Sequence, residues 1–422
     1  MYTETEQEVL QYVNENDVKF IKLFFTDIFG ILRSISIMPD FLEQAFSQGV
    51  PFNASAIKGF LQTTSSDLFL KPDPKTLAVL PWRPQQGRVV RLYCDIVYPD
   101  GTPFEGDTRH VLKQCVEEIK SSGYGCYIRT KCEFYLFEQD ENGYPTKIPH
   151  DQAGYCALAP EDRGENVRRD ICLTLEQLGL HPEISYHEKG PGQHEIDFKY
   201  GKAFEAADDM SSFKNTVQTI ASRNGLAASF CPKPLPNFSG SGFHINIALT
   251  KDGKSLFDST GTNTKTKAFI AGILQYIREI TAFLNPLRCS YSRFGTFEAP
   301  RLLTWSSQNH SQLIRIPSTP GEFQHIEIRS PDPSCNHYLA FTLLLRAGME
   351  GIRQNLPLDL PLEASDWEKD TVPAEKKLPS SLNEALRLAA DSPFVASILP
   401  RSIVQAYVEA KTSHEDSYFG IV

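Results

Sequence analysis

The sequence predicts an α+β chain of two domains: a small, strand-rich domain at residues 1–105 and a larger domain of helices and strands at residues 106–422. Two observations lead to this prediction. Between residues 18 and 38, apolar and polar side chains alternate on both sides of Gly30, as in two paired, half-buried strands. Beyond residue 105, apolar side chains recur mostly at the spacing of a helix, with short strand-like runs between them.

The first domain begins with a short polar helix that ends near Glu15, directly before the strand pair. Several prolines between residues 72 and 84 then interrupt the pattern, and Val89 to Val97 again has the composition of a strand. The turn Pro99-Asp100-Gly101 follows this strand. Because prolines and tight turns punctuate compact units, the first domain is expected to close near residue 105.

The second domain alternates helical and strand-like segments, which is typical of an α+β domain. Helices are expected at residues 108–122, 165–178, 210–224, 266–284, 338–353 and 402–411. Strands are expected at residues 127–138, 194–199, 244–249, 311–316 and 325–329. Residues 356–377 are rich in proline and acidic side chains, and we expect an exposed loop there.

Composition excludes several classes of partner. The 422 residues include 42 Lys and Arg against 52 Asp and Glu, a formal charge of -10, and no basic stripe that would bind nucleic acid. Apolar stretches stay shorter than the roughly 20 residues that span a bilayer, so no membrane association is expected. The acidic N-terminus lacks a signal core, and nine cysteines without a C-x-x-C pair fit a reducing compartment. The sequence therefore predicts a cytoplasmic protein.

Common nucleotide-binding motifs are missing. The nearest match to a phosphate-binding loop is Gly253-Lys254-Ser255, but Ala248 stands where that loop needs its first glycine. No G-x-G-x-x-G follows a strand. Use of ATP would therefore require a different architecture.

Glutamates within or beside the predicted strands are the strongest chemical signal. Glu133, Glu188, Glu195 and Glu327 have this placement. Carboxylates turned into a cleft are costly unless a cation compensates them, and oxygen ligands with one imidazole suit Mg²⁺ or Mn²⁺. A single strand glutamate is more often only solvated, so both interpretations stay open at this point.

Three arginines, Arg293, Arg315 and Arg329, lie near apolar strands. A guanidinium in such surroundings needs an anionic partner. That partner is either an anionic ligand or a carboxylate of the protein itself.

Motifs spread along the chain carry a family resemblance. They are FTDIFG at residues 25–30, SDLFLKPDPKTLAVLPW at 66–82, CDIVYPDGTPFEGDTR at 94–109, CEFYLF at 132–137, GPGQHEIDF at 190–198, SGSGFHI at 239–245, FEAP at 297–300, SQLIRIP at 311–317 and HIEIRSPDP at 325–333. In this order they resemble the bacterial type I glutamine synthetase family over nearly the whole chain. The resemblance implies a small N-terminal β-grasp domain and a large catalytic domain. It also implies a homo-dodecamer of two stacked hexameric rings, with each active site between neighbouring subunits.

The resemblance assigns roles to individual residues. Glu133, Glu188 and Glu195 match the ligands of a metal that positions the substrate carboxylate and the transferring phosphoryl group. Arg293 and Arg329 match the arginines that hold the amino-acid substrate, as a planar guanidinium fork holds a carboxylate.

Further matches complete the implied site. Gly240 and His244 match groups on the substrate side, and Glu298 matches a flap residue that closes the site against water. Asp27 and Tyr155 match residues that form an ammonium pocket.

In the family mechanism, the γ-carboxylate of glutamate takes the γ-phosphoryl group of ATP, and ammonia then displaces phosphate. Arg315 matches a phosphate-binding arginine of the first step, in which negative charge spreads over three oxygens. The resemblance therefore implies an enzyme of nitrogen metabolism. It would ligate ammonia or an amine to glutamate through a γ-glutamyl phosphate, with Mg²⁺ or Mn²⁺ as cofactor and ATP as co-substrate.

The main departure from the family concerns a second metal, on the ATP phosphates. In the family, that metal is bound by the first Glu of an E-x-E pair, together with residues that align here with His244 and Glu327. Here the pair is Lys131-Cys132-Glu133, and residues i and i+2 share a strand face, so Lys131 projects into the site. A unit charge about 6 Å from a dication would repel it by roughly 5 kcal/mol at an effective dielectric near 20.

Two interpretations of Lys131 stay open. In one, its ammonium replaces the charge of the second metal, pairs with Glu327 or Glu133 in the ligand-free protein, and touches a phosphate when ATP binds. In the other, the nucleotide chemistry of the family is lost.

The rest of the nucleotide half departs as well. His310 and His325 replace two arginines expected on the ATP phosphates, Asn246 replaces a histidine, and Ser239 stands where a substrate-binding asparagine is usual. Two other functions therefore stay open beside the ligase. One is a catalytically degenerate homologue that binds an amino acid or acts in assembly. The other is a metal-dependent amide hydrolase that uses no ATP.

Overall fold

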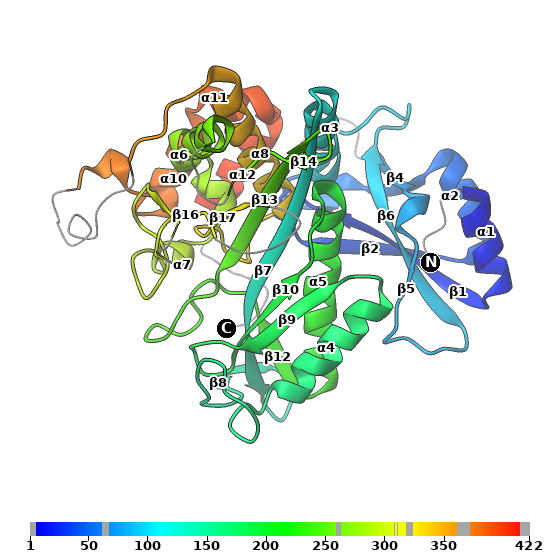
Figure 1. Ribbon diagram of the computed structural model, residues 1–422. Coiled ribbons are helices and arrows are strands. Elements are labelled where there is room, and N and C mark those ends of the chain that lie inside the picture. Colours follow the sequence, from blue (N-terminus) through cyan, green and yellow to red (C-terminus); the bar gives the residue numbers. More distant parts are fainter. Residues whose placement is uncertain are drawn as a thin grey trace.

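The computed structural model describes residues 6–60, 67–258, 263–307, 309, 311–317, 324–360 and 372–413. Figure 1 shows three parts side by side: the N-terminal strands in blue and cyan, a sheet with long strands in the middle, and a group of C-terminal helices on its other side. The predicted α+β class, with a small N-terminal domain and a large domain of helices and strands, is confirmed.

The N-terminal domain is built on a sheet of strand order β2-β1-β6-β4-β3, with β5 paired to β6. Its strands are β1 Val18–Thr26, β2 Leu32–Ile37, β3 Val50–Asn53, β4 Asp67–Pro72, β5 Ala78–Val79 and β6 Arg88–Val97. The predicted strand pair is confirmed, because β1 and β2 run antiparallel with Thr26 opposite Leu32. β1 pairs with β6 in parallel, as in a β-grasp sheet. Helices α1 (Glu6–Glu15) and α2 (Leu42–Gln48) belong to this domain.

The second sheet is organised around one long strand, β7 (Tyr124–Gln139). Its order is β15-β16-β17-β13-β7-β10-β9, while β8, β11 and β12 also pair with β7 and β14 pairs with β13. The other strands are β8 Pro145–Pro149, β9 Pro182–His187, β10 Gln193–Phe198, β11 Gly201–Lys202, β12 Leu226–Ser229, β13 Phe243–Lys251, β14 Lys254–Ser255, β15 Trp305–Ser306, β16 Ile314–Arg315 and β17 Ile326–Ile328. Because β13 and β10 flank β7, side chains from three distant segments share one face at its centre.

Helices pack on the second sheet and on one another (Figure 1). They are α3 Thr108–Ser121, α4 Glu165–Gln177, α5 Ala203–Arg223, α6 Thr264–Leu284, α7 Arg288–Tyr291, α8 His337–Gln354, α10 Leu382–Ala390, α11 Pro393–Ile398 and α12 Arg401–Thr412, with 3-10 turns at Pro39–Phe41, Ala54–Ala56, Pro74–Thr76 and Ala374–Lys376. Helices α6 and α8 approach so closely that a Cβ at position 272 would clash with the Ala347 carbonyl oxygen, and glycine at this position permits the contact. Among the residues that the structure describes, no helix is long and apolar enough to cross a membrane.

Most of the predicted elements are present. Helices α3, α4, α6, α8 and α12 agree with the predicted ranges to within two residues at each end, and β7, β10 and β13 occupy the first three predicted strands of the large domain. Helix α5 begins at Ala203 rather than Met210, because the side chains buried in its first turns are small alanines, which give a weak apolar signal. The strands predicted at 311–316 and 325–329 shorten to β16 and β17.

Short elements escape prediction because they contain too few residues to show a period. The sequence did not predict α7, α10, α11, β9 or β12. In the predicted loop at 356–377, the described part contains a 3-10 turn, and residues 361–371 lie outside the described residues. Strand β6 ends and α3 begins on either side of residue 105, and the domain boundary predicted there stays a prediction.

The two domains meet at a buried cluster of charges around Arg109, near the start of α3. Its guanidinium forms ion pairs with Asp73 and Asp95 of the N-terminal domain and with Asp208 of α5. Arg109 Nη2 lies 2.8 Å from Asp73 Oδ2 and 2.9 Å from Asp208 Oδ2. One guanidinium therefore joins the two domains.

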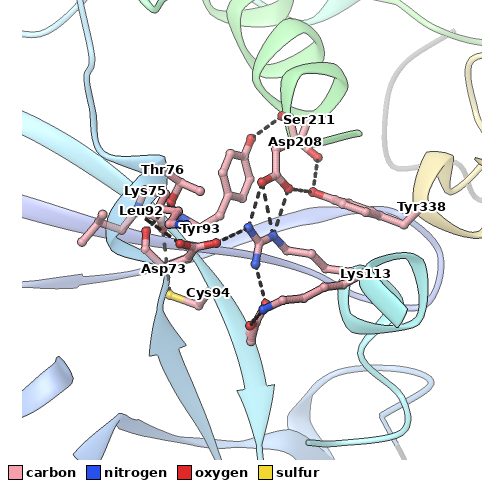
Figure 2. A network of polar contacts seen from close by, with 12 residues as sticks. Asp73, Lys75, Thr76, Leu92, Tyr93, Cys94, Lys113, Asp208, Ser211 and Tyr338 are labelled. Carbon is pink, nitrogen blue, oxygen red and sulfur yellow. Dashed lines mark hydrogen bonds and ion pairs between the residues drawn. The ribbon is translucent and has the colours of Figure 1, made fainter. Parts of the chain in front are cut away.

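Polar groups around this cluster complete it, as Figure 2 shows. Tyr338 on α8 donates its hydroxyl proton to Asp208 Oδ1 at 2.7 Å, and Tyr93 on β6 donates to the Asp208 carbonyl oxygen at 2.9 Å. Lys113 Nζ lies 3.0 Å from Asp95 Oδ2. A buried charge network stabilises a fold only when its members satisfy one another, and this one does.

Candidate active site

A cavity of about 340 Å³ opens at the centre of the second sheet, where β7, β10, β13 and β17 contribute side chains. Loops that follow β9 and α7 and the loop before β13 form its rim. The predicted site residues that line it are Lys131, Glu133, Tyr155, Glu188, Glu195, Ser239, Gly240, His244, Arg293, Glu298, Arg315, Glu327 and Arg329. One sheet therefore gathers most of the predicted site.

Strand register explains why these side chains converge. Glu133 on β7 lies opposite Glu195 on β10, which lies opposite Tyr186 on β9. In the neighbouring row, Lys131 on β7 lies opposite Asp197 on β10. Residues two apart on a strand share a face, so both rows point to the same side of the sheet.

A further row on this face crosses β7, β13, β17 and β16. Asn246 on β13 lies between Arg129 on β7 and Glu327 on β17. Arg315 on β16 lies opposite Glu327. This row brings basic side chains to the side of the cavity that is farthest from β9.

Glu133, Glu195 and His244, which we call the metal group, offer ligand atoms within 4.8 Å of one another. His244 Nε2 lies 3.9 Å from Glu133 Oε1. The other oxygen, Glu133 Oε2, accepts hydrogen bonds from Gln193 Nε2 and from the Gly242 backbone N–H, both at 2.9 Å. Two carboxylates and one imidazole in this arrangement fit Mg²⁺ or Mn²⁺.

Glu188, the third predicted ligand, lines the same cavity but lies outside the metal group. It directly follows β9, and its Oε2 accepts a hydrogen bond from the Lys189 backbone N–H at 2.9 Å. His187 anchors this segment, since its Nδ1 is 2.7 Å from the Glu188 carbonyl oxygen and its Nε2 is 3.0 Å from Asp151 Oδ1. Binding of one ion by all three glutamates would therefore require the Glu188 side chain to move.

Arginines surround Glu327 in the other half of the cavity. Arg315 Nη1 lies 3.3 Å and Arg329 Nη1 lies 3.5 Å from Glu327 Oε2. The Nε atoms of Arg315 and Arg329 are buried and have no hydrogen-bond partner in the described residues. Arg293 differs, because its Nη1 and Nη2 donate to the carbonyl oxygens of Ser330 and Arg329, both at 2.9 Å. Arg293 is thus fixed in the wall by backbone carbonyl oxygens, whereas Arg315 and Arg329 contact a carboxylate, that of Glu327, and both line the cavity.

The pKa shifts of the buried carboxylates differ between the metal group and the surroundings of Glu327. Burial raises the pKa of Glu133 to about 7, and repulsion from Glu188 adds to this effect. Burial, followed by repulsion from Asp197 and Glu133, raises the pKa of Glu195 well above its usual value. The nearby cations, among them Lys131 at 3.9 Å from Glu195 Oε1, do not fully offset the burial and repulsion of these carboxylates.

Glu327 has the opposite shift. Burial alone would raise its pKa, but three cations hold it below the usual value. They are Arg329, Lys131 and Arg315. The half of the cavity around Glu327 is therefore already neutralised by the protein.

Lys131 lines the cavity, in agreement with the i, i+2 argument, but its partners differ from those predicted. Its ammonium forms an ion pair with Asp197 Oδ2 at 3.0 Å and lies 3.9 Å from Glu195 Oε1, rather than pairing with Glu327 or Glu133. The cause is strand register, because β10 places Asp197 directly opposite Lys131. The predicted pairing is corrected accordingly.

Asp27 does not line this cavity, and its predicted place in an ammonium pocket stays a prediction. Its side chain is completely buried, and Oδ1 accepts hydrogen bonds from the backbone N–H groups of Phe29 and Ile31, both at 3.0 Å. Its Oδ2 accepts hydrogen bonds from Arg33 at 3.0 and 2.8 Å. These bonds close the turn between β1 and β2. Within the subunit, this carboxylate therefore holds a turn.

Asn246 and His325 do not line the cavity either. Asn246 is buried and donates from Nδ2 to the Arg129 carbonyl oxygen at 3.3 Å. His325 is buried against Tyr200, with ring centroids 5.6 Å apart. Both are therefore buried outside the lining of the cavity. His310 lies outside the described residues.

Several residues of the site were missed by sequence reasoning. Tyr186 donates its hydroxyl proton to Glu195 Oε1, and Lys189 forms an ion pair with Glu298 at 2.6 Å on the rim. Asp197 supports Lys131. The signal for Asp197 was present, because it follows Glu195 by two residues on a predicted strand and so shares its face. The contact of Lys189 depends on two loops and leaves no such pattern.

Comparison with known proteins identifies the family. Residues 17–99 match the family described as "Glutamine synthetase, beta-Grasp domain", and residues 105–420 match "Glutamine synthetase, catalytic domain". The chain belongs to the glutamine synthetase family. The glutamine synthetase of Clostridium saccharobutylicum is 44% identical over 423 residues, which cover 98% of this chain and 96% of the relative. That of Methanosarcina mazei is 44% identical over 427 residues, with 99% and 96% covered.

Solved structures agree with this assignment to the glutamine synthetase family. A ligand-free GmaS structure has a TM-score of 0.86 at 27% identity and covers 96% of this chain and 94% of that one. A complex of GmaS with ADP has a TM-score of 0.87 at 25% identity, with 98% and 95% covered. As a glutamine synthetase family member, this chain is an enzyme of the carboxylate-amine ligase type, a class that uses ATP and divalent metal ions.

Proposed function

We propose that this chain ligates ammonia or an amine to the γ-carboxylate of glutamate, with ATP as co-substrate and through a γ-glutamyl phosphate. One observation carries the proposal: within a single cavity, buried carboxylates that could hold a metal ion lie beside arginines that line the same cavity. The first part suits Mg²⁺ or Mn²⁺, and the second suits carboxylate and phosphoryl oxygens. The relatives named glutamine synthetase and the ADP complex of GmaS support ATP as the co-substrate.

Each half has its own task in this proposal. Glu133, Glu195 and His244 would hold the divalent cation, whose charge would stabilise the transferring phosphoryl group. Arg329 and Arg315, which line the cavity, would bind the carboxylate of the amino acid and the phosphoryl oxygens. Because the two reacting groups are held in one cavity, their encounter no longer depends on diffusion.

Residues on the rim of the cavity are assigned to closing the site and to contacting the entering amine. Glu298 and Lys189 form an ion pair while their side chains stay 48% and 42% exposed, so this contact can open and close at little cost. We assign Glu298 to closing the site against water. Tyr155 lies edge-on to Tyr186, with ring centroids 5.7 Å apart, and is itself 59% exposed. This position at the mouth suits a residue that contacts the entering amine.

The proposal includes a cytoplasmic homo-dodecamer of two hexameric rings. The sequence resemblance supports this assembly, as does the exposure of Tyr155 and Phe297, two large rings at the mouth of the cavity. Mass measurement in solution should give twelve subunits, and a stable folded monomer alone would contradict the assembly.

The decisive experiment measures phosphate release from ATP with glutamate and a panel of amines that includes ammonia and methylamine. We expect release that requires glutamate, an amine and Mg²⁺ or Mn²⁺, and that is abolished in Glu133→Gln. Hydrolysis of glutamine by protein and metal alone would instead support an amide hydrolase. Glutamate binding without any turnover would support a degenerate binding homologue.

A further inference from the structure

We propose that the cavity takes a single divalent cation, and that the Lys131 ammonium, positioned by Asp197, occupies the place of a second cation beside the nucleotide phosphates. This inference rests on the proposed function, because it assigns part of the same cavity to ATP. It adds Asp197 as a positioning residue and predicts a metal count that can be measured without turnover.

The cavity contains two acidic positions, and they differ in how their charge is balanced. The metal group is one position, with ligand atoms within 4.8 Å of one another. At the other, Glu327 already forms ion pairs with Arg315 at 3.3 Å and with Arg329 at 3.5 Å. A divalent cation at the first position relieves repulsion between carboxylates, whereas one at the second position meets two guanidinium groups.

His244 shows that the two positions are neighbours. Its Nε2 lies 3.9 Å from Glu133 Oε1, and its Nδ1 lies 3.9 Å from Glu327 Oε1. Lys131 is directly opposite His244 in the register of β7 and β13. A second dication between His244 and Glu327 would therefore lie next to an ammonium as well, and the position is better suited to an anion held by these cations.

Asp197 fixes Lys131 in this place. It lies between two cations, with Lys131 Nζ at 3.0 Å and Arg129 Nη2 at 3.2 Å from its Oδ2. Its side chain is 1% exposed and does not line the cavity, so it acts on a ligand only through Lys131. The Lys131 side chain is 26% exposed, and an ammonium has three donors, which leaves N–H groups for phosphate oxygens.

Titration of Mn²⁺ into the wild-type protein, followed by calorimetry and by the loss of the free-ion electron paramagnetic resonance signal, counts the ions. We expect one Mn²⁺ per subunit. Lys131→Glu, which places two carboxylates on the same face of β7, should bind two. Lys189→Glu makes the same charge change in the same cavity, but on the rim, and should still bind one.

A second measurement tests the link to nucleotide. Binding of the β,γ-imido analogue of ATP at saturating Mn²⁺ should weaken about tenfold in Lys131→Met, the loss of roughly one charge-assisted hydrogen bond. Asp197→Asn should weaken it by a similar factor without changing the Mn²⁺ count. Asp197→Glu should restore part of the affinity, because it again supplies a carboxylate to Lys131.

Two Mn²⁺ ions per wild-type subunit would overturn the inference, as would an equal gain of metal in Lys189→Glu and Lys131→Glu. Full analogue affinity in Lys131→Met would also overturn it. None of these results depends on turnover. An active ligase with two bound ions would contradict only this inference, whereas an inactive protein with one bound ion would contradict only the proposed function.

Independently, we infer that Cys231 and Cys289 form a reversible disulfide under oxidation. Cys231 follows β12 and Cys289 lies in α7, and their Sγ atoms are 3.8 Å apart, in van der Waals contact. Both residues are half-buried. A disulfide needs sulfur atoms at about 2.05 Å, so the pair is within reach of a small side-chain and backbone movement.

The two cysteines belong to segments that meet in the cavity wall. The carbonyl oxygen of Pro232, the residue after Cys231, accepts a hydrogen bond from the Ser241 backbone N–H at 3.0 Å. Arg293 follows α7, and a Cβ on Gly240 would lie 3.0 Å from Arg293 Cδ. Because this wall has no spare space, a bond that draws α7 toward Cys231 also displaces Arg293 relative to Gly240.

The reaction needs a two-electron oxidant, and hydrogen peroxide represents the class. Two thiols and one peroxide give one disulfide and two molecules of water. Both S–H bonds and the O–O bond break, one S–S bond forms, and the two sulfur atoms together release the two electrons that reduce the peroxide.

Peroxide treatment followed by non-reducing peptide mass spectrometry should give a Cys231–Cys289 cross-linked peptide that dithiothreitol removes. We expect kcat/KM for glutamate to fall at least about tenfold on oxidation and to recover on reduction, since small misplacements of substrate groups are costly. Cys231→Ser should resist peroxide, and Cys172→Ser, at a cysteine of the same exposure on α4, should not. Absence of the cross-linked peptide while other thiols are oxidised, or equal peroxide sensitivity of Cys231→Ser and wild type, would show that the inference is wrong.

Discussion

The Arg109 cluster and the metal group both bury charged side chains, but they differ in how far nearby cations offset the cost of burying their carboxylates. In that cluster, burial alone would raise the pKa of Asp95, yet Arg109 and Lys113 hold it below the usual value. In the metal group, burial and neighbouring carboxylates raise the pKa values of Glu133 and Glu195. The first cluster is electrostatically complete, and the second is incomplete without a cation.

This difference separates structural charge from functional charge. Around Arg109, polar groups from the N-terminal sheet, α3, α5 and α8 satisfy one another, so the cluster fixes how the two domains pack. The carboxylates of the metal group lie in a cavity that solvent can enter. Buried carboxylates with raised pKa values in a cavity mark a binding site, whereas paired ones mark a support of the fold.

The largest expected effect comes from breaking the complete cluster. Arg109→Met leaves three aspartates without their shared cation and should lower the free energy of unfolding by roughly 3–5 kcal/mol, measured by urea denaturation. Lys113→Met is the matched control, because Lys113 pairs with the same cluster but its side chain is 38% exposed. It should cost less than about 1 kcal/mol. Equal losses in the two variants would contradict the view that Arg109 holds the domains together.

Breaking the incomplete cluster should affect binding instead of folding. Glu195→Gln keeps the shape of the side chain and removes one charge, so the affinity for Mn²⁺ should fall roughly a hundredfold or more in calorimetric titration. The unfolding temperature measured in EDTA should not fall, because repulsion within the metal group decreases. Glu298→Gln, a change on the rim, should leave the Mn²⁺ affinity nearly intact. Unchanged affinity in Glu195→Gln would place the metal elsewhere.

The stabilisation of the protein by Mg²⁺ should depend on pH, because the metal group contains a carboxylate with a raised pKa. Since the pKa of Glu133 is raised to about 7, the metal-free folded protein holds a proton there at lower pH, and Mg²⁺ must displace it. The rise in unfolding temperature caused by Mg²⁺ should therefore be small near pH 6 and increase toward pH 8, as differential scanning fluorimetry can measure. A Mg²⁺-dependent rise that is the same at both pH values would argue against a buried carboxylate as the ligand.

The smallest effect is expected at the exposed rim. Lys189 pairs with Glu298, but both side chains are close to half-exposed, so Lys189→Met should change the free energy of unfolding by less than about 1 kcal/mol. Chemical denaturation of this variant beside Arg109→Met tests whether burial, rather than the number of ion pairs, decides the cost. A loss of several kcal/mol at Lys189 would show that the rim supports the fold.

Much of the fold was accessible from the sequence because long elements show a clear period. Strand β7, helix α6 and helix α8 display it over many residues, so their positions were predicted within a few residues. Two-residue strands such as β15 and β16 show no period, and they form only because β17 offers a neighbour to pair with. Helix α5 was predicted too short because its buried alanines resemble a neutral segment.

For the site, the sequence was informative about which residues take part and less so about their partners. Glu133, Glu195 and Glu327 were singled out from their place on predicted strands, and they do line the cavity. Asp27 was singled out by a motif, and the structure adds that its carboxylate closes a turn within the subunit. A sequence motif indicates which side chains take part in a site. The burial and hydrogen bonds of each side chain are seen only in the structure.

The sequence by itself determined the α+β class, the two-part organisation, the glutamates and arginines of the cavity, and the presence of Lys131 among them. Only the tertiary structure decided that Lys131 pairs with Asp197, that the Asn246 side chain donates to the Arg129 carbonyl oxygen, and that Arg109 joins the domains. The physical reason is that the period of a strand tells which face a side chain occupies. Its partner depends on the register between strands that are far apart in the chain.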